Sequence, residues 1–239
     1  MLAIIGGTGL TALKGLALQD SIAVETPYGT PSAQIEKGEL NGSPVFFLAR
    51  HGKAHSLTPH TVNYRANIWA LQSLGVTRIL GVNAVGGIND SMGPEVIVIP
   101  DQIIDYTWGR QSSFSEENNV IHADFTYPYT EELRQRLLEA AEKVSVSVCD
   151  GGVYGATQGP RLETAAEINR LEKDGCDIVG MTAMPEAILA RELDMQYANI
   201  SLVVNNAAGR SEGLITMDDI QRVLDAGMGR VRMLLGAMV

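Results

Sequence analysis

The chain has 239 residues, of which 45% are hydrophobic, and carries a formal net charge of −10. This length and composition are sufficient for a large core, and we expect a single domain over residues 1–239. The acidic balance argues against a general nucleic-acid-binding protein, because contacts to a phosphate backbone need a basic surface. The absence of a long apolar run and of a secretory signal pattern favours a cytoplasmic protein without a membrane partner.

Apolar segments that predict strands alternate with amphipathic segments that predict helices, which indicates an α/β fold. The predicted strands are residues 2–7, 22–26, 78–87, 95–100, 149–157, 177–182 and 197–209. The predicted helices are residues 62–75, 130–144, 163–175, 184–194 and 217–238. Two further strand-like runs flank Asn41-Gly42, a dipeptide typical of a two-residue hairpin turn. The prediction is one α/β domain with a central mixed β-sheet flanked by helices.

The first predicted strand leads into Gly7-Thr8-Gly9, which begins a G-x-G-x-x-A pattern. This pattern is typical of dinucleotide-binding turns, in which the glycines open a helix of about a dozen residues. Residues 11–20 are too short for such a helix and contain a glycine, and a hairpin follows. The turn could instead hold one phosphate through backbone N–H groups and the Thr8 hydroxyl, or it could be a tight turn without a ligand.

Three of the four histidines, His51, His55 and His60, lie within ten residues, directly after Arg50. Such a cluster could hold a metal ion, but a glycine and a proline predict a loop, and no acidic residue occurs in this segment. Arg50 and His51 beside a glycine suit an oxyanion, because a guanidinium offers a fork of two donors and an imidazole a further donor. We therefore predict an anion site here and no metal site.

Six motifs occur in order along nearly the whole chain. They are IIGGTG, ARHG with a later VNYRAN, VNAVGGIND, TQGPRLET, IVGMTAMPEAILARE and VVNNAAG. Together they resemble the trimeric purine nucleoside phosphorylase family, and in particular its branch that acts on methylthio nucleosides. The resemblance implies a homotrimer with a site shared between subunits, and reversible phosphorolysis of a purine nucleoside without a metal or organic cofactor. It favours inorganic phosphate as the ligand of the glycine turn.

The resemblance also implies roles for individual residues. The phosphate would be held by Thr8, Arg50, His51, the Ala84 backbone N–H and Thr182. His51 and Asn205 would be catalytic, and Met181 would line the ribose. Without the resemblance, Met181 would be interpreted as a core methionine.

The base pocket indicates which purine is bound. Glu163 and Asn205 lie where the 6-oxopurine enzymes of the family keep a carboxylate and an amide. A carboxylate accepts from N1–H of hypoxanthine or guanine, whereas adenine has a lone pair at N1. The 6-aminopurine branch instead has aspartates at the positions of Asn205 and Ala207, and neither is present here. Leu162 replaces an aromatic residue that often stacks near the base.

The 5′ end of the sugar would contact the start of the last helix. Ile220 lies where relatives that use inosine have a histidine, and Val223 and Leu224 share its apolar helix face. Such a face is by itself more typical of core packing, but beside the other motifs it suggests a pocket for an S-methyl group. His122 resembles a residue that reaches this pocket from the neighbouring subunit.

These features predict phosphorolysis of S-methyl-5′-thioinosine to hypoxanthine and S-methyl-5-thioribose 1-phosphate. The nearest alternatives are a 5′-methylthioadenosine phosphorylase and a broad inosine and guanosine phosphorylase. Alternatives from other classes are a nucleoside hydrolase, a nucleotide-binding module without turnover, and a dehydrogenase.

Overall fold

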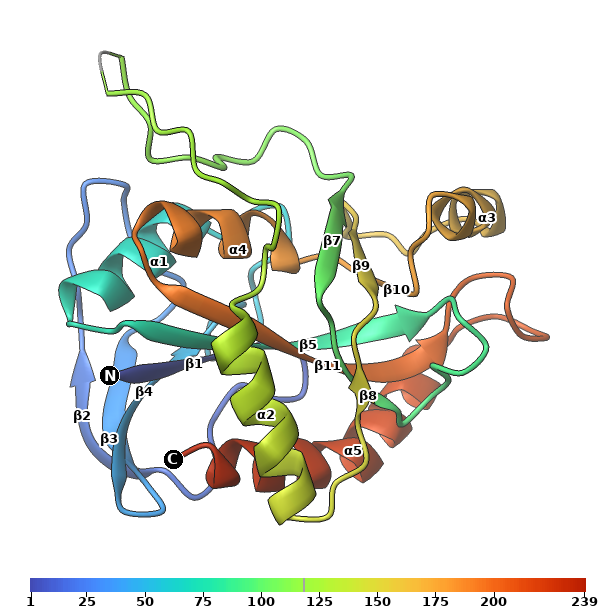
Figure 1. Cartoon of the computed structure of the whole chain (residues 1–239), viewed down its shortest axis with the longest axis horizontal. Helices are drawn as coiled ribbons and strands as arrows, with labels where there is room; N and C mark the ends of the chain where they lie inside the picture. The colour runs from blue at the N-terminus through green and yellow to red at the C-terminus, as the bar shows by residue number, and fades with distance from the viewer. Residues whose placement is uncertain (118) are drawn as a thin grey trace.

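A computed structural model describes residues 1–117 and 119–239 and places a sheet between two groups of helices (Figure 1). The strands of this described part are β1 (Leu2–Gly6), β2 (Ala17–Ile22), β3 (Ile35–Leu40), β4 (Ser43–Ala49), β5 (Arg78–Gly87), β6 (Ile97–Ile99), β7 (Gln102–Asp105), β8 (Cys149–Asp150), β9 (Val153–Ala156), β10 (Ile178–Gly180) and β11 (Gln196–Asn206). The helices are α1 (Tyr64–Ser73), α2 (Glu131–Lys143), α3 (Ala165–Lys173), α4 (Ala183–Glu192) and α5 (Met217–Ala237). Every predicted helix is present, and its ends differ by at most two residues from the prediction.

The strands form one mixed sheet around the long central strand β5. Its main path runs β2-β3-β4-β1-β5-β10-β9-β7, while β11 pairs with β5 and β6, and β6 pairs with β8. β1 is parallel to β4 and β5, whereas β10 is antiparallel to β5. The predicted hairpin is confirmed, because Leu40 pairs with Ser43 and the two turn residues, Asn41 and Gly42, have positive φ angles of 50° and 81°. The expected mixed α/β fold is therefore confirmed.

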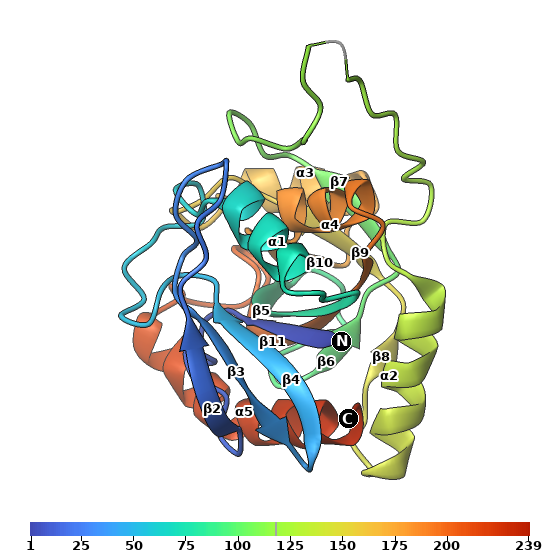
Figure 2. The same ribbon diagram turned by 90° about the vertical axis from the view of Figure 1, so that its left-hand side faces the viewer.

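Helices cover both faces of the sheet, and each face has its own core. Successive residues of a strand point to opposite faces. In β1, Leu2 and Ile4 pack with α2 and α5, whereas Ala3 and Ile5 pack with α1 and α4. Figures 1 and 2 show these two helix pairs on opposite sides of β5 and β11. Burial on both faces explains why the central strands are continuously apolar. Within the described ranges, no helix is long and apolar enough to cross a membrane.

The edges of the sheet differ from the prediction. The strand predicted at 22–26 is wrong, because β2 covers Ala17–Ile22 and pairs with β3. The side chains of β2 are mostly exposed, and the strand therefore has no hydrophobic pattern. β7, at the other end of the sheet, was not predicted either, and pairs with β9. Pairing with a neighbour defines such strands, and local sequence contains little information about it.

A long segment between β7 and α2, residues 106–129 apart from 118, projects from the body of the molecule (Figures 1 and 2). We call it the arm. One point of the arm is attached to α4, where the Ser113 hydroxyl and the Phe114 N–H donate to the Glu192 carboxylate at 2.9 and 2.6 Å. His122 lies farther along the arm and is exposed. The arm therefore carries a predicted site residue whose side chain is exposed in its own chain.

Candidate active site

The candidate site is built around a stretch of β5 that, in the described part of the chain, has no neighbouring strand on one edge, which we call the gap. β1 pairs with this edge as far as Val82, and β10 joins it at Gly86. No strand of the described residues pairs with the edge at 83–85. The Val82 carbonyl accepts from the Gly7 N–H at 3.1 Å, on the side of β1. Because the N–H groups of alternate residues point to the same strand edge, the Ala84 N–H faces the gap. Open α/β sheets bind ligands at such interruptions.

The glycine turn after β1 forms one wall of this gap. A Cβ atom on Gly6 would lie 2.1 Å from the Leu10 carbonyl oxygen, and therefore only glycine fits. Gly9 has a φ angle of 82°, which L side chains rarely adopt. Thr8 lies between these glycines and lines the gap. Residues 10–16 form turns and bends but no helix, and the turn therefore lacks the helix of a dinucleotide fingerprint.

A cavity of about 320 Å³ opens over the gap and brings together most of the predicted site residues. Those that line it are Thr8, Arg50, His51, Ala84, Leu162, Glu163, Met181, Thr182, Asn205, Ala207 and Ile220. Three predicted residues, His122, Val223 and Leu224, are not part of its described lining. The lining residues come from segments far apart in the sequence.

Arg50 follows β4 and is completely buried. Its Nε and Nη2 atoms donate to the two carboxylate oxygens of Glu186, each at 2.7 Å, and Nη1 donates to the Val82 carbonyl at 2.9 Å. Burial lowers the pKa of Arg50, but the charge of Glu186 and the hydrogen bonds to it outweigh burial and raise this pKa. The fork of donors predicted to hold the anion is therefore occupied by Glu186, which corrects that part of the prediction. Nη1 lies beside Gly7, and one of its two N–H groups is used by the Val82 carbonyl. Its second N–H is the donor that Arg50 can offer to a ligand.

His51 is buried next to Arg50, with its Nδ1 atom 2.8 Å from the Leu57 carbonyl oxygen. A carbonyl can only accept, and Nδ1 therefore carries the proton while Nε2 of the neutral ring is an acceptor. Burial and the charge of Arg50 lower the pKa of His51 to about 4. At neutral pH the imidazole can therefore accept a hydrogen bond at Nε2, for example from the hydroxyl group of HPO₄²⁻, whereas the sequence predicted a donor. Within the described ranges, no group of three or more His, Cys, Asp or Glu side chains could hold a metal ion.

Thr182 ends a chain of buried polar side chains. The Ser201 hydroxyl donates to Asn199 Oδ1 at 2.7 Å, and Asn199 Nδ2 donates to Asn83 Oδ1 at 3.1 Å. Asn83 Nδ2 in turn donates to Thr182 Oγ1 at 2.9 Å. Because Thr182 Oγ1 accepts this bond, its own proton remains available for an acceptor in the cavity that Thr182 lines. The network thus leaves Thr182 able to donate to a ligand.

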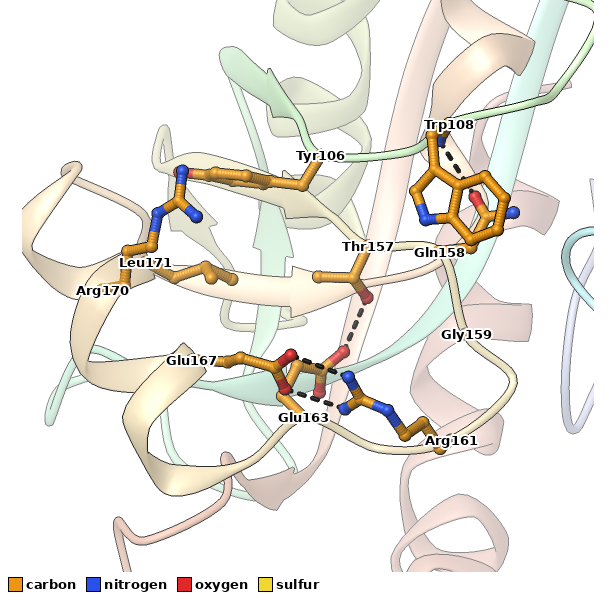
Figure 3. Close-up of a pocket in the computed structure, with 10 residues that line it drawn as sticks. All are labelled: Tyr106, Trp108, Thr157, Gln158, Gly159, Arg161, Glu163, Glu167, Arg170 and Leu171. Carbon is orange, nitrogen blue, oxygen red and sulfur yellow. Dashed lines mark hydrogen bonds and ion pairs between the residues drawn. The ribbon is translucent and has the colours of Figure 1, made fainter.

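A carboxylate and an amide also line the cavity. Glu163 lies in the loop between β9 and α3, and its Oε1 atom accepts from the Thr157 hydroxyl at 2.6 Å (Figure 3). Asn205 lies near the end of β11, where the register with β5 shifts between Val203 and Asn205. Such an irregularity changes the direction of a side chain, and it is frequent beside active sites. Asn205 Nδ2 donates to the Asn206 carbonyl at 2.7 Å, which leaves its Oδ1 atom and a second N–H for a ligand.

The apolar face predicted at the start of α5 divides between cavity and core. Ile220 lines the cavity. Leu224 is buried in the core beside Gly9, and Val223 packs against the same core. The expectation that all three side chains form the pocket is therefore corrected to Ile220, because Val223 and Leu224 lie one turn, about 5.4 Å, farther along the helix axis, where the same face meets the core. Met217 lines the cavity instead.

Arg110, at the base of the arm, connects two walls of the cavity and was not singled out from the sequence. Its Nη1 atom donates to the Met181 and Met184 carbonyls at 2.7 and 2.6 Å, and Nη2 donates to the Thr157 and Gln158 carbonyls at 3.2 and 2.8 Å. It therefore joins the loop after β9 to the loop after β10. Its acceptors lie 47 to 74 positions away in the chain, and no local pattern could have indicated them.

The amino-acid sequence of this chain is similar to those of named proteins. A relative from Pseudomonas syringae pv. tomato, named "Probable S-methyl-5'-thioinosine phosphorylase", is 55% identical in an alignment that covers 99% of this chain and 97% of the relative. A relative of the same name from Xanthomonas campestris pv. campestris is 53% identical, over 99% of this chain and 96% of its own length.

The fold is also similar to that of a solved structure. Methylthioadenosine phosphorylase from Schistosoma mansoni in complex with adenine has a TM-score of 0.94 and 33% sequence identity, and the match covers 99% of this chain and 90% of that one. A model of the phosphorylase superfamily matches residues 1–239. The chain therefore belongs to the phosphorylase superfamily.

Proposed function

We propose that this protein catalyses the phosphorolysis of S-methyl-5′-thioinosine to hypoxanthine and S-methyl-5-thioribose 1-phosphate. The observation that carries the proposal is that one cavity is lined both by side chains suited to an anion and by a carboxylate and an amide suited to a purine base. We assign Thr8, Arg50 and Thr182 to a first end, beside Val82 and Asn83 of β5, and Glu163 and Asn205 to a second end, beside Gly86. The names of the relatives that are 55% and 53% identical support the same substrate.

The first end of the cavity would hold inorganic phosphate, the co-substrate, and no metal or organic cofactor is needed. A phosphate oxygen bonds to C1′ of the sugar while the bond from C1′ to the purine breaks, and its electron pair leaves with the base. Thr8, the Ala84 N–H, Thr182 and the second N–H of Arg50 Nη1 donate to the phosphate, and His51 Nε2 accepts a hydrogen bond from the phosphate hydroxyl group. These groups orient the nucleophile before the reaction.

The second end would stabilise the departing base, which gains negative charge in the transition state. Asn205 donates to O6 of hypoxanthine and accepts from a protonated N7, while Glu163 accepts from N1–H. Adenine would bring its N1 lone pair toward Glu163, and this mismatch costs about 1–3 kcal/mol. The arrangement therefore favours a 6-oxopurine.

The sugar would lie between these ends, with Met181 along the ribose. Ile220 and Met217 line the cavity with apolar side chains, and an S-methyl group fits such a surface better than a hydroxyl group, which would lose its hydrogen bonds. We further propose a homotrimer in which the arm brings His122 to the cavity of the neighbouring subunit. The exposed position of His122 on a projecting segment supports this part.

Steady-state kinetics with four nucleosides test the proposal. S-methyl-5′-thioinosine, S-methyl-5′-thioadenosine, inosine and adenosine are compared at fixed phosphate, and each is repeated in phosphate-free buffer. We expect S-methyl-5′-thioinosine to have the highest kcat/KM and every turnover to require phosphate.

Each contrary result identifies a different alternative. A higher kcat/KM for S-methyl-5′-thioadenosine would make the protein a 5′-methylthioadenosine phosphorylase, as in the Schistosoma mansoni structure. Release of base without phosphate would indicate a hydrolase. Binding without any turnover would indicate a recognition module.

A further inference from the structure

A second cavity lies directly behind the base end of the candidate active site. It measures about 460 Å³, and Figure 3 shows the residues around it. Glu163 lines both cavities, whereas Thr157 lines only the second one. The Glu163 carboxylate therefore forms part of the wall between them, and Thr157 lies on the side away from the substrate.

Hydrogen bonds of the backbone fix the position of Thr157 in the chain. The Thr157 N–H donates to the Gly180 carbonyl at 2.8 Å, and the Thr157 carbonyl accepts from Arg110 Nη2 at 3.2 Å. The Thr157 hydroxyl lies 2.6 Å from Glu163 Oε1 and 3.3 Å from the Gly180 carbonyl oxygen. The shorter distance is in the range of a hydroxyl that donates to a carboxylate, and Glu163 is therefore its main acceptor.

The charged neighbours of Glu163 are occupied by other partners. Arg161 Nη1 and Nη2 donate to the two oxygens of Glu167 at 2.8 and 2.7 Å. Glu167 also accepts from the Thr164 N–H at 2.7 Å as part of the capping box that starts α3. In the described part of the chain, Thr157 is the one side chain that donates to Glu163.

We infer that Thr157 is a positioning residue for base specificity: it holds Glu163 Oε1 from behind, so that the second oxygen of the carboxylate faces N1 of the bound purine. This inference rests on the proposed function, in which Glu163 accepts from N1–H. A glutamate without this bond can rotate toward water in the second cavity, and it then neither binds N1–H well nor repels the N1 lone pair of adenine. A carboxylate held in place binds N1–H of a 6-oxopurine and repels the N1 lone pair of adenine.

The test compares Thr157→Val, which keeps the shape but lacks the hydroxyl, with Thr157→Ser, which keeps the hydroxyl. The affinities for hypoxanthine and adenine are measured by calorimetry in the presence of phosphate, and kcat/KM is measured for the two methylthio nucleosides. Thr157→Val should weaken hypoxanthine binding about tenfold and change adenine binding less than about twofold. Thr157→Ser should retain the wild-type ratio. Thr77→Val, an exposed threonine outside the cavity lining, is the matched control.

A double-mutant cycle shows whether Thr157 acts through Glu163. In a Glu163→Ala background, Thr157→Val should no longer change the ratio of the two affinities. An equal loss for both bases, or the same loss in the Glu163→Ala background, would overturn the inference, because Thr157 would then only support the loop. An unchanged ratio in Thr157→Val would also overturn it.

The wild-type measurements separate this result from the proposed function. If the wild type prefers adenine or shows no phosphorolysis, the proposed function fails, whatever Thr157 does. The ratio of hypoxanthine to adenine affinity in the Thr157 variants is measured without turnover, and it therefore still tests the inference. If Thr157→Val does not fold, Thr157→Ala in the same cycle replaces it.

Discussion

The residues that we propose bind phosphate follow strands of the central sheet, whereas those that we propose bind the base and sugar include exposed residues of a loop and of the start of α5. Arg50 is 0% exposed and Thr182 6%, and both have buried polar partners. At the other end, Leu162 is 43% exposed and Met217 70%. The residues proposed to bind phosphate are thus part of the core, whereas those proposed to bind the nucleoside divide between the exposed Leu162 and Met217 and the buried Ile220.

This difference has a physical reason. A small anion needs hydrogen-bond donors that point in fixed directions. Buried hydrogen-bond networks fix these donors during folding, so that little conformational entropy is lost when the anion binds. Bases and sugars differ among nucleosides by single groups, and loop residues can change without disturbing the core. Substitutions at the phosphate end should therefore impair both stability and turnover, whereas those among the residues proposed to bind the nucleoside should change substrate preference.

Arg50→Ala should have the largest effect. The loss of a charge-assisted hydrogen bond, worth about 1.5–3 kcal/mol, should raise the phosphate KM by about tenfold to a hundredfold. Glu186 would also remain buried without its cation, which should lower the free energy of unfolding by about 3–5 kcal/mol. Kinetics with varied phosphate and urea unfolding measure the two effects.

The double variant Arg50→Met/Glu186→Gln separates these effects, because it removes both charges. It should regain most of the lost stability but not the phosphate affinity. A folded variant without Arg50 that keeps the wild-type phosphate KM would exclude Arg50 from the anion site.

Asn205→Asp should change the base preference. An ionised aspartate cannot donate to O6, and we expect kcat/KM for S-methyl-5′-thioinosine to fall by about tenfold to a hundredfold while the gap to S-methyl-5′-thioadenosine narrows. Full reversal is not expected, because Glu163 still faces N1. Kinetics with both nucleosides at saturating phosphate test this. An equal fall for the two would mean that Asn205 positions the end of β11 rather than binding the base.

Ile220→His should change the sugar preference by a smaller factor, of about threefold to tenfold toward inosine relative to S-methyl-5′-thioinosine. The new imidazole can bond a 5′-hydroxyl group and is a poor neighbour for an S-methyl group. Val223→His is the matched control on the same helix, since Val223 is outside the described cavity lining, and it should leave the ratio unchanged. If both variants change the ratio equally, the division of this face between cavity and core is wrong.

His51 should cause the smallest effect, in the pH dependence of stability. Its pKa is lowered from 6.5 to about 4 on folding, and the unfolded chain therefore binds the proton first as the pH falls. Its contribution to stability is complete above pH 6.5 and is lost as the pH falls toward about 4. His51→Asn keeps an N–H for the Leu57 carbonyl but does not titrate, and urea midpoints across this window should depend less on pH. If the urea midpoint of His51→Asn depends on pH as strongly as that of the wild type, His51 is not neutral in the folded protein.

Local sequence determined the helices, the central strands and the hairpin at Asn41-Gly42, because burial on one or both faces and turn chemistry leave a clear pattern. The edge strands β2 and β7 were not predicted, since β2 is mostly exposed and the pairing partners of both strands lie elsewhere in the chain. Motif resemblance also identified eleven residues that converge on one cavity, as each motif follows a strand or begins a helix near the same gap.

Only the tertiary structure decided how those residues are used. The partners of Arg50, His51 and Thr182 come from other segments, and they determine which hydrogen-bonding groups remain for a ligand. Arg110 and Thr157 gain their roles in the same way, through acceptors that local sequence does not bring together. A sequence pattern specifies the side chains that are available, whereas the direction of each donor and acceptor depends on the groups that folding places next to it.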